Sequence, residues 1–254
     1  MILFTKTCAR DAERVFYQAL AARRFVRDMT KHIVVVERDE LKAAPALHHL
    51  REYGVQVDVL EEVMPRLADV ANPYLRQQLV KLYAPVRYGQ SLVQIDSDMC
   101  PVAPCSLSWV FGPTFMPTWC YNSAPSHELR DTLRDWAATY VALFGARPLW
   151  PWRSYMLEQH GWHLDFGAAA ALWREIDVDC AERIYERTGG RFSEYQFFGW
   201  WAHERSYAYN WHDISLYGLH NLKSWVEHYT SSEPLTEMQR RRLRELAGGV
   251  ACPS

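Results

Sequence analysis

The sequence predicts an α/β protein with a mainly parallel sheet of the nucleotide-binding type, flanked by helices. Two observations carry this prediction. From Met1 to Ile95, short apolar segments with strand character alternate with segments of helical periodicity, a pattern typical of βαβ units in a parallel sheet. Beyond Pro101 the chain becomes proline-punctuated and aromatic-rich. We therefore expect one domain in which a second half completes a site on the first.

Four strands are predicted in the first part of the chain. They cover Met1–Thr5, Lys31–Val36, Val55–Leu60 and Leu92–Ile95. The second of these is a β-branched run, which indicates a strand buried on both faces. Two segments between the strands have apolar residues at helical spacing: one begins after Asp11, which can cap a helix, and the other covers Arg76–Arg87 and stops at Gly89.

In the remainder of the chain, the sequence pattern predicts three further helical segments. They cover His127–Leu143, Phe166–Arg187 and Leu235–Ala247. Thr236 and Gln239 have the spacing of a capping box at the start of the last one. We divide the single domain into a nucleotide-binding type α/β half at 1–100, a second half at 101–230 that completes the site, and a C-terminal helix and tail at 231–254.

Composition excludes several classes of protein. Hydrophobic residues make up 49% of the chain and the formal net charge is −2, so neither global disorder nor nucleic-acid binding is indicated. Apolar stretches such as Phe166–Trp173 are far shorter than the roughly 20 residues that cross a bilayer. Lys6 and Arg10 stand where a signal peptide needs its apolar middle. We expect a cytoplasmic protein whose six cysteines are reduced thiols.

Two aspartates follow the fourth predicted strand directly. Asp96 and Asp98 are separated by Ser97, and ligands of open α/β sheets bind at the carboxyl ends of the strands. Two closely spaced carboxylates repel each other unless a cation lies beside them. Carboxylates together with phosphate oxygens are the usual ligands of Mg²⁺ and Mn²⁺. The pattern predicts a metal-chelated diphosphate at this edge, with a solvated Asp-rich turn as the alternative.

These features together resemble the GT-A nucleotide-sugar glycosyltransferases. The residues that carry the resemblance are Thr5 and Arg10 after the first strand, Glu37 after the second, Gln77 and Lys81 on a helix, and the QIDSD segment ending at Asp98. The tail LHNLKSW at 219–225 is similar to the His-x-x-x-Lys-Pro-Trp ending of the glycogenin and galactosyltransferase branch. Here Ser224 replaces the proline, and one residue fewer separates His220 from Lys223.

The resemblance implies a role for each of these residues. Asp98 and His220 would ligate Mn²⁺ or Mg²⁺, and Asp96 would contact the donor sugar or ribose, with or without a bond to the metal. The other implied donor-binding residues are Thr5 and Glu37 at the base and ribose, Arg10, Lys81 and Lys223 at the phosphates, and Gln77 on the helical face of Lys81. His203, His212 and His228 are alternatives to His220 as the metal ligand. For Gln77 and Lys81, the alternative is that they lie on the solvent-exposed side of an amphipathic helix and bind no ligand.

A base for the acceptor hydroxyl is expected in the second half. Glu194 is the best candidate, because Ser193 and Gln196 have capping-box spacing and place it in the first turn of a helix. The helix dipole alone would also favour a carboxylate there, and Asp165 and Asp213 are the competing acids. The aromatic run Phe197, Phe198, Trp200 and Trp201 is interpreted as an acceptor platform or as core.

The function expected from this pattern is sugar transfer. A nucleotide diphosphate sugar, UDP-sugar by default, would donate to a hydroxyl of a glycan acceptor, in synthesis of a cell-surface polysaccharide or glycoconjugate. The arginines between Arg240 and Arg244 form a solvated face or a peripheral contact with the inner face of a membrane. The alternatives are a non-catalytic sugar-binding module and a haloacid-dehalogenase-like phosphatase. The phosphatase motif would place Thr or Val at Cys100 and lie near the chain start.

Overall fold

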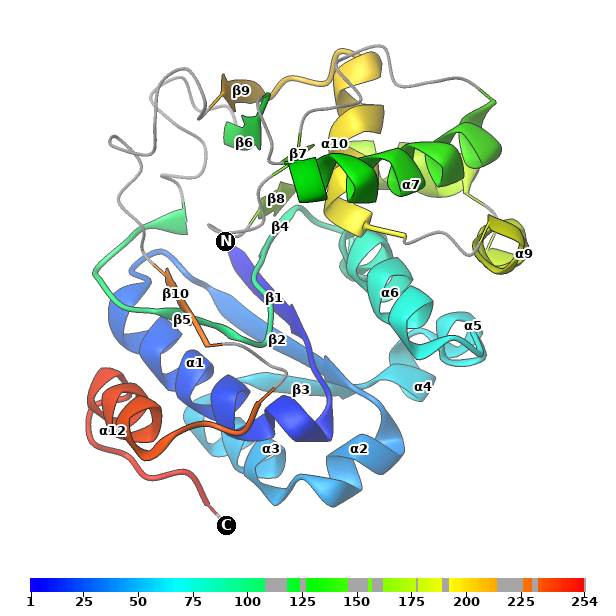
Figure 1. Ribbon diagram of the computed structural model, residues 1–254. Coiled ribbons are helices and arrows are strands. Elements are labelled where there is room, and N and C mark those ends of the chain that lie inside the picture. The colour runs from blue at the N-terminus through cyan, green and yellow to red at the C-terminus, as the bar shows by residue number, and fades with distance from the viewer. Residues whose placement is uncertain are drawn as a thin grey trace.

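The computed structural model describes residues 1–107, 118–123, 127–145, 155–156, 162–176, 178–188, 192–213, 226–229 and 233–253. Its central sheet has five strands in the order β3-β2-β1-β4-β8 (Figure 1). These strands are β1 (Ile2–Lys6), β2 (Lys31–Val36), β3 (Gln56–Val59), β4 (Leu92–Gln94) and β8 (Trp162–Leu164). The first four are parallel, as the sequence predicts, and β8 pairs antiparallel with β4. The predicted α/β class is confirmed.

The strands of the first half are joined by helical connections. The elements are η1 (Ala9–Asp11), α1 (Ala12–Phe25), α2 (Arg38–Ala43), α3 (Pro45–His49), η2 (Leu50–Tyr53), α4 (Leu60–Val63), α5 (Pro65–Ala68) and α6 (Pro73–Tyr88). The side chain of Asn72 accepts from the backbone N–H of Leu75 and caps α6. Gly89 ends α6 with a left-handed φ of 67°, a conformation that glycine adopts without strain.

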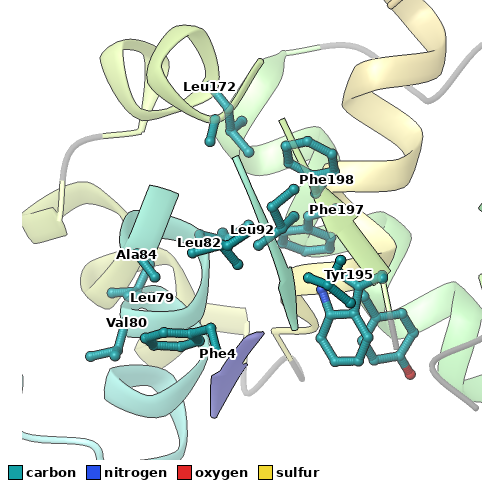
Figure 2. Packing of buried hydrophobic residues seen from close by; sticks show 14 of the residues in the cluster. Phe4, Leu79, Val80, Leu82, Ala84, Leu92, Leu172, Tyr195, Phe197 and Phe198 are labelled. Atoms are coloured by element: carbon teal, nitrogen blue, oxygen red, sulfur yellow. The ribbon is translucent and has the colours of Figure 1, made fainter. Parts of the chain in front are cut away.

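The apolar core lies on both faces of the sheet. In β2, Ile33 and Val35 belong to the cluster on the α6 face, and Val34 and Val36 to the cluster on the α1 face. Successive side chains of a strand point to opposite faces, so a strand covered on both sides needs a continuous apolar run. Figure 2 shows the first cluster, in which Phe4 packs beside α6. This burial on both faces explains why the apolar KHIVVV run predicts a strand.

The chain after β4 adds helices and small sheets on both sides of the central sheet (Figure 1). Its elements are β5 (Met99–Pro101), β6 (Thr118–Asn122), α7 (His127–Phe144), β7 (Tyr155–Met156), α8 (Phe166–Glu175), α9 (Val178–Thr188), α10 (Glu194–Glu204), β9 (Asn210–Asp213), β10 (Val226–His228) and α12 (Glu237–Leu246). The helical stretch expected over Phe166–Arg187 is two helices, because the backbone is extended at Ile176.

The Arg-rich helix α12 packs against α1 and carries the expected capping box at Thr236. Arg240 pairs with Glu13 at 3.0 Å, Arg241 with Glu245 at 3.4 Å, and Arg242 with Glu227 at 3.2 Å. These pairs place part of the positive charge against carboxylates of the protein itself. Contact of α12 with an anionic membrane stays a prediction. Among the described residues, no helix has the length and apolar character of a membrane span.

Candidate active site

A cleft of about 930 Å³ opens at the carboxyl ends of β1, β2 and β4. Each of these strands supplies polar residues to its lining. They are Lys6, Thr7, Cys8 and Arg10 at β1, Glu37 and Glu40 after β2, and Asp96, Ser97 and Asp98 after β4. Helix α6 contributes Gln77 and Lys81, and α10 contributes Glu194. The cleft therefore occupies the edge at which open α/β sheets bind their ligands.

Asp96 and Asp98 both line this cleft, but strand alternation is not the reason. Strand β4 ends at Gln94, and the two aspartates lie in a turn closed by a 3.1 Å hydrogen bond from the backbone N–H of Met99 to the carbonyl of Asp96. The turn, and not the pleat of a strand, brings both aspartates to one cleft.

Lys81 lies between two carboxylates at the inner end of the cleft. Its Nζ is 2.6 Å from Oδ1 of Asp96 and 2.7 Å from Oε1 of Glu194. The side chain is 4% exposed, and the Glu194 side chain is 1% exposed. Burial alone would lower the pKa of Lys81, but the two carboxylates outweigh it and raise that pKa above its ordinary value. Lys81 is therefore a fixed positive charge.

Glu194 starts α10 as the sequence predicts. The hydroxyl of Ser193 accepts from the backbone N–H of Gln196, and Oε1 of Gln78 accepts from the backbone N–H of Glu194. Burial raises the pKa of Glu194, Lys81 opposes this shift, and Asp96 adds to it. Among the described residues no donor reaches Oε2 of Glu194. One oxygen of this carboxylate is thus held by Lys81, and the other is a buried acceptor with no hydrogen-bond partner among the described residues.

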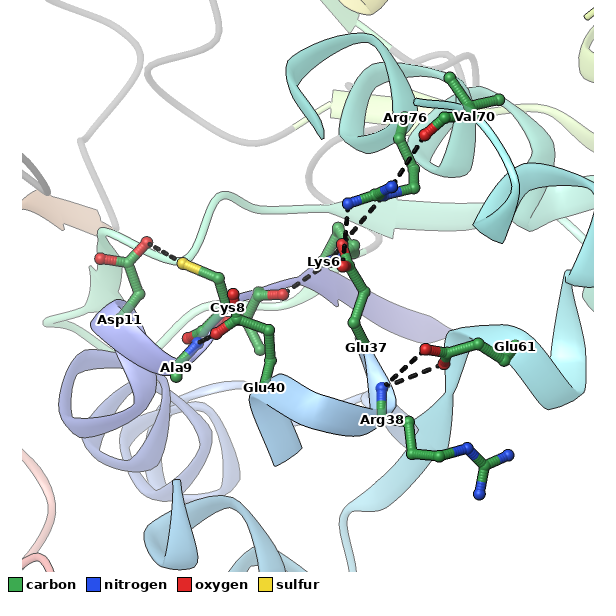
Figure 3. Close-up of polar contacts among 11 residues, drawn as sticks. Lys6, Cys8, Ala9, Asp11, Glu37, Arg38, Glu40, Glu61, Val70 and Arg76 are labelled. Atoms are coloured by element: carbon green, nitrogen blue, oxygen red, sulfur yellow. Dashed lines mark hydrogen bonds and ion pairs between the residues drawn. The ribbon is translucent and has the colours of Figure 1, made fainter. Parts of the chain in front are cut away.

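Glu37 is held by two cations at the other side of the cleft (Figure 3). Arg76 donates to both of its carboxylate oxygens, at 3.1 and 2.9 Å, and Nζ of Lys6 lies 3.6 Å from Oε1. Burial lowers the pKa of Lys6 and Glu37 opposes that shift. The sequence analysis does not predict Arg76 or Lys6 as site residues. The polar face of α6, which also carries the predicted Gln77, is the signal that could have indicated Arg76.

Of the other predicted donor-binding residues, some are in the described lining of the cleft and others are not. Arg10 lines the cleft with a 65% exposed side chain, and Gln77 shares the cleft with Lys81. Thr5 is fully buried in β1 and lies behind the described lining, where its hydroxyl donates to Oε1 of Gln18 at 2.9 Å. His220 and Lys223 lie outside the described residues.

The competing acid Asp165 and the aromatic run lie outside the described lining of the cleft. Asp165 caps α8 by accepting from the backbone N–H of Ala168, and Asp213 is the last residue of β9. Phe197, Phe198, Trp200 and Trp201 are each 0% exposed and belong to the core. The core interpretation of this run is confirmed and the platform interpretation is wrong, because these rings fill the space beneath α10. Among the described residues, the aromatic side chains in the lining of the cleft are Tyr74, Trp136 and Tyr195.

The donor set of the Asp96–Asp98 turn fits a hard divalent cation. Two carboxylates on one side of a cleft, with the remaining positions left to water and phosphate, are how proteins usually hold Mg²⁺. Asp96 also carries Lys81 on one oxygen. Within the described ranges no three His, Cys, Asp or Glu side chains gather into a metal-binding group. The predicted third ligand, His220, lies in 214–225, outside the described residues.

Comparisons with known proteins place this geometry in a fold family. No protein-family model and no curated protein sequence matches the chain. The structure of galactosyltransferase LgtC in complex with donor and acceptor sugar analogues is similar, with a TM-score of 0.55 and 12% identity over 100% of this chain and 98% of that chain. Mouse xyloside xylosyltransferase 1 in its apo form matches with a TM-score of 0.45 and 10% identity, over 92% and 99%. The likeness to LgtC shows that the chain has a GT-A-type fold, as the sequence predicts.

Proposed function

We propose that this chain is a metal-dependent glycosyltransferase that moves a sugar from a nucleotide diphosphate sugar, UDP-sugar by default, to a hydroxyl of a glycan acceptor. The observation that carries the proposal is the placement of Asp96 and Asp98 together in one cleft at the carboxyl edge of a GT-A-type sheet. A non-catalytic sugar-binding module would not need this pair. A haloacid-dehalogenase-like phosphatase would have Thr or Val two residues after the second aspartate, where this chain has Cys100.

The donor is held through its diphosphate. Asp96 and Asp98, with His220 as the proposed third ligand, would hold Mn²⁺ or Mg²⁺, which would offset the charge of the leaving diphosphate. Arg10, whose side chain is exposed in the cleft, and Lys223 are proposed to contact the phosphates. Lys81 is already paired with two carboxylates, so we assign it to the alignment of Asp96 and Glu194. Glu37 and Gln77 line the remaining donor surface.

The chemical step breaks the bond between the anomeric carbon and the diphosphate oxygen. That oxygen leaves with the bonding electrons, and the sugar passes through an oxocarbenium-like state. The acceptor oxygen forms the new bond, and its proton passes to Oε2 of Glu194. Oε2 has no hydrogen-bond partner among the described residues, whereas Lys81 holds the other oxygen. The raised pKa of Glu194 makes it a stronger base than an ordinary glutamate.

Replacing Glu194 with glutamine tests this base. Glutamine keeps the volume and the acceptor for Lys81 but cannot take the proton. We expect kcat to fall by about 10²–10⁴-fold, the usual contribution of general base catalysis, with donor affinity unchanged in calorimetry. Glu186→Gln, on α9, is a control outside the described lining of the cleft. A retained rate would point to a retaining mechanism or to another base.

Acceptor identity and cellular role are further parts of the proposal. Tyr74 is 40% exposed at the cleft and offers a ring face to an acceptor sugar. The proposed acceptor is a glycan of a cell-surface polysaccharide or glycoconjugate. The proposed place of the reaction is the cytoplasm, with α12 near the membrane.

Isothermal calorimetry tests the function directly. UDP-sugars and GDP-sugars are titrated into the protein with Mn²⁺ and again with the metal removed by EDTA. We expect donor binding that requires the metal, followed by slow hydrolysis of the donor. Binding of a glycan without metal-dependent nucleotide binding would favour the sugar-binding module instead.

A further inference from the structure

The turn that carries both aspartates is held from beneath by a buried amide on α1. Gln18 is 0% exposed, and its Nε2 lies 2.5 Å from the carbonyl oxygen of Asp96 and 2.6 Å from that of Met99. An amide nitrogen has two N–H groups, and these two carbonyls stand at the two ends of the turn. The side chain of Gln18 therefore connects both ends of the Asp96–Met99 turn to α1.

The orientation of this amide is fixed by a chain of hydrogen bonds. Oε1 of Gln18 accepts from the hydroxyl of Thr5, which also lies 3.2 Å from Nε2 of His32. A hydroxyl has one proton, so His32 must donate to Thr5 through Nε2. Burial lowers the pKa of His32 to about 3, which keeps the ring neutral, and no described group reaches its Nδ1. The donors thus run in one direction, from His32 through Thr5 and Gln18 to the turn.

The remaining residues of the turn are anchored as well. The hydroxyl of Ser97 donates to Oδ2 of Asp11 at 2.9 Å, and the backbone N–H of Tyr229 donates to the carbonyl of Asp98 at 2.7 Å. Asp11 stands at the N-cap position of α1, but its carboxylate contacts Ser97 and Arg14. Its predicted capping bond is wrong, because these partners hold the carboxylate away from the described first turn of the helix.

We propose that Gln18 is a positioning residue that fixes the Asp96–Met99 turn in the form in which both aspartates face the cleft, and that it thereby sets the affinity for a divalent cation. This inference rests on the proposed function. Three polar side chains, Gln18, Thr5 and His32, are buried behind the cleft at the cost of their hydration. The hydrogen bonds among these side chains, and those from Gln18 to the turn, offset this cost.

The variant Gln18→Met tests the inference, because methionine keeps the length of the side chain and removes both donors. The probe is Mn²⁺ alone, and the free ion is measured by electron paramagnetic resonance at increasing protein concentration. We expect the dissociation constant for Mn²⁺ to rise by about 10-fold or more, as happens when groups that orient metal ligands are removed. Thr5→Val leaves Gln18 in place without its orienting donor, and we expect a smaller rise of about 3-fold.

A matched control separates positioning from stability. Phe16→Leu perturbs the same helix at a fully buried ring that packs edge-on against Tyr53, and it leaves the turn intact. We expect urea denaturation to show Phe16→Leu and Gln18→Met both destabilised, with Mn²⁺ affinity reduced in Gln18→Met alone. Wild-type affinity in folded Gln18→Met overturns the positioning role and leaves the proposed function standing. If Gln18→Met does not fold, the same comparison with Thr5→Val decides the matter. Lack of Mn²⁺ binding by the wild-type protein overturns both.

Discussion

Replacing Asp98 with alanine is expected to remove nearly all Mn²⁺-dependent turnover while the protein stays folded. Asp98 lines the cleft, and its place in the turn is held through its backbone carbonyl, which accepts from Tyr229. Alanine keeps that bond and removes the carboxylate. Loss of a metal ligand that offsets transition-state charge costs several kcal/mol, so we expect kcat/KM to fall by about 10³-fold. Steady-state kinetics with a nucleotide sugar and Mn²⁺ measure the loss.

The control for this variant is an aspartate on the surface. Asp39 lies on α2, its side chain is 91% exposed, and it pairs with Lys42 at 2.9 Å. Asp39→Ala removes the same charge from the protein but not from the cleft, and we expect its turnover and Mn²⁺ affinity to match the wild-type protein. Thermal denaturation should give both variants a melting temperature close to that of the wild type. Unchanged turnover in Asp98→Ala would remove the metal assignment.

The parts of the fold that the sequence predicted are those in which burial imposes a pattern. The Lys31–Val36 run is apolar because both faces of β2 are covered, and Gly89 marks the end of α6 because the chain turns there with a positive φ. The short elements were not predicted. Helices α4 and α5 have four residues each, which is too few to show a helical period. Strand β8 has three residues and gains its place only by pairing with β4.

The same limit applies to the candidate site. The Asp96–Asp98 pair was predicted because both residues follow a readable strand. Lys81 and Glu194 are 113 residues apart in the chain, so their ion pair depends on the way α10 packs over α6. Gln18 could have been found from one clue, since it is a polar residue within the apolar face of a predicted helix. Which groups that amide contacts becomes visible only when β4 and α1 are placed together.

Replacing Lys81 with methionine is expected to destabilise the protein strongly. The ammonium group stands between Asp96 and Glu194, at 2.6 and 2.7 Å, and methionine would leave both carboxylates without a counter-charge. Breaking a buried ion pair by removing one partner costs about 3–5 kcal/mol. Urea denaturation of the variant measures the free energy of unfolding. Lys42→Met is the matched control, because that lysine is 69% exposed and makes a surface pair that contributes about 0–1 kcal/mol.

The double variant Lys81→Met/Glu194→Gln separates the effect of the ion pair between Lys81 and Glu194 from that of the other contacts of Lys81. Glu194 is 1% exposed, whereas Asp96 is 19% exposed and retains some contact with water. Removal of the more deeply buried charge should therefore recover part of the stability that Lys81→Met loses, because the neutral amide is cheaper to bury than an unpaired carboxylate. Turnover should not recover, since both the base and the aligned Asp96 are lost. Equal destabilisation of the single and double variants would mean that Lys81 stabilises the fold through a contact other than its ion pair with Glu194, for example the cation–π contact of its Nζ with the ring of Trp162, 5.5 Å from the centroid.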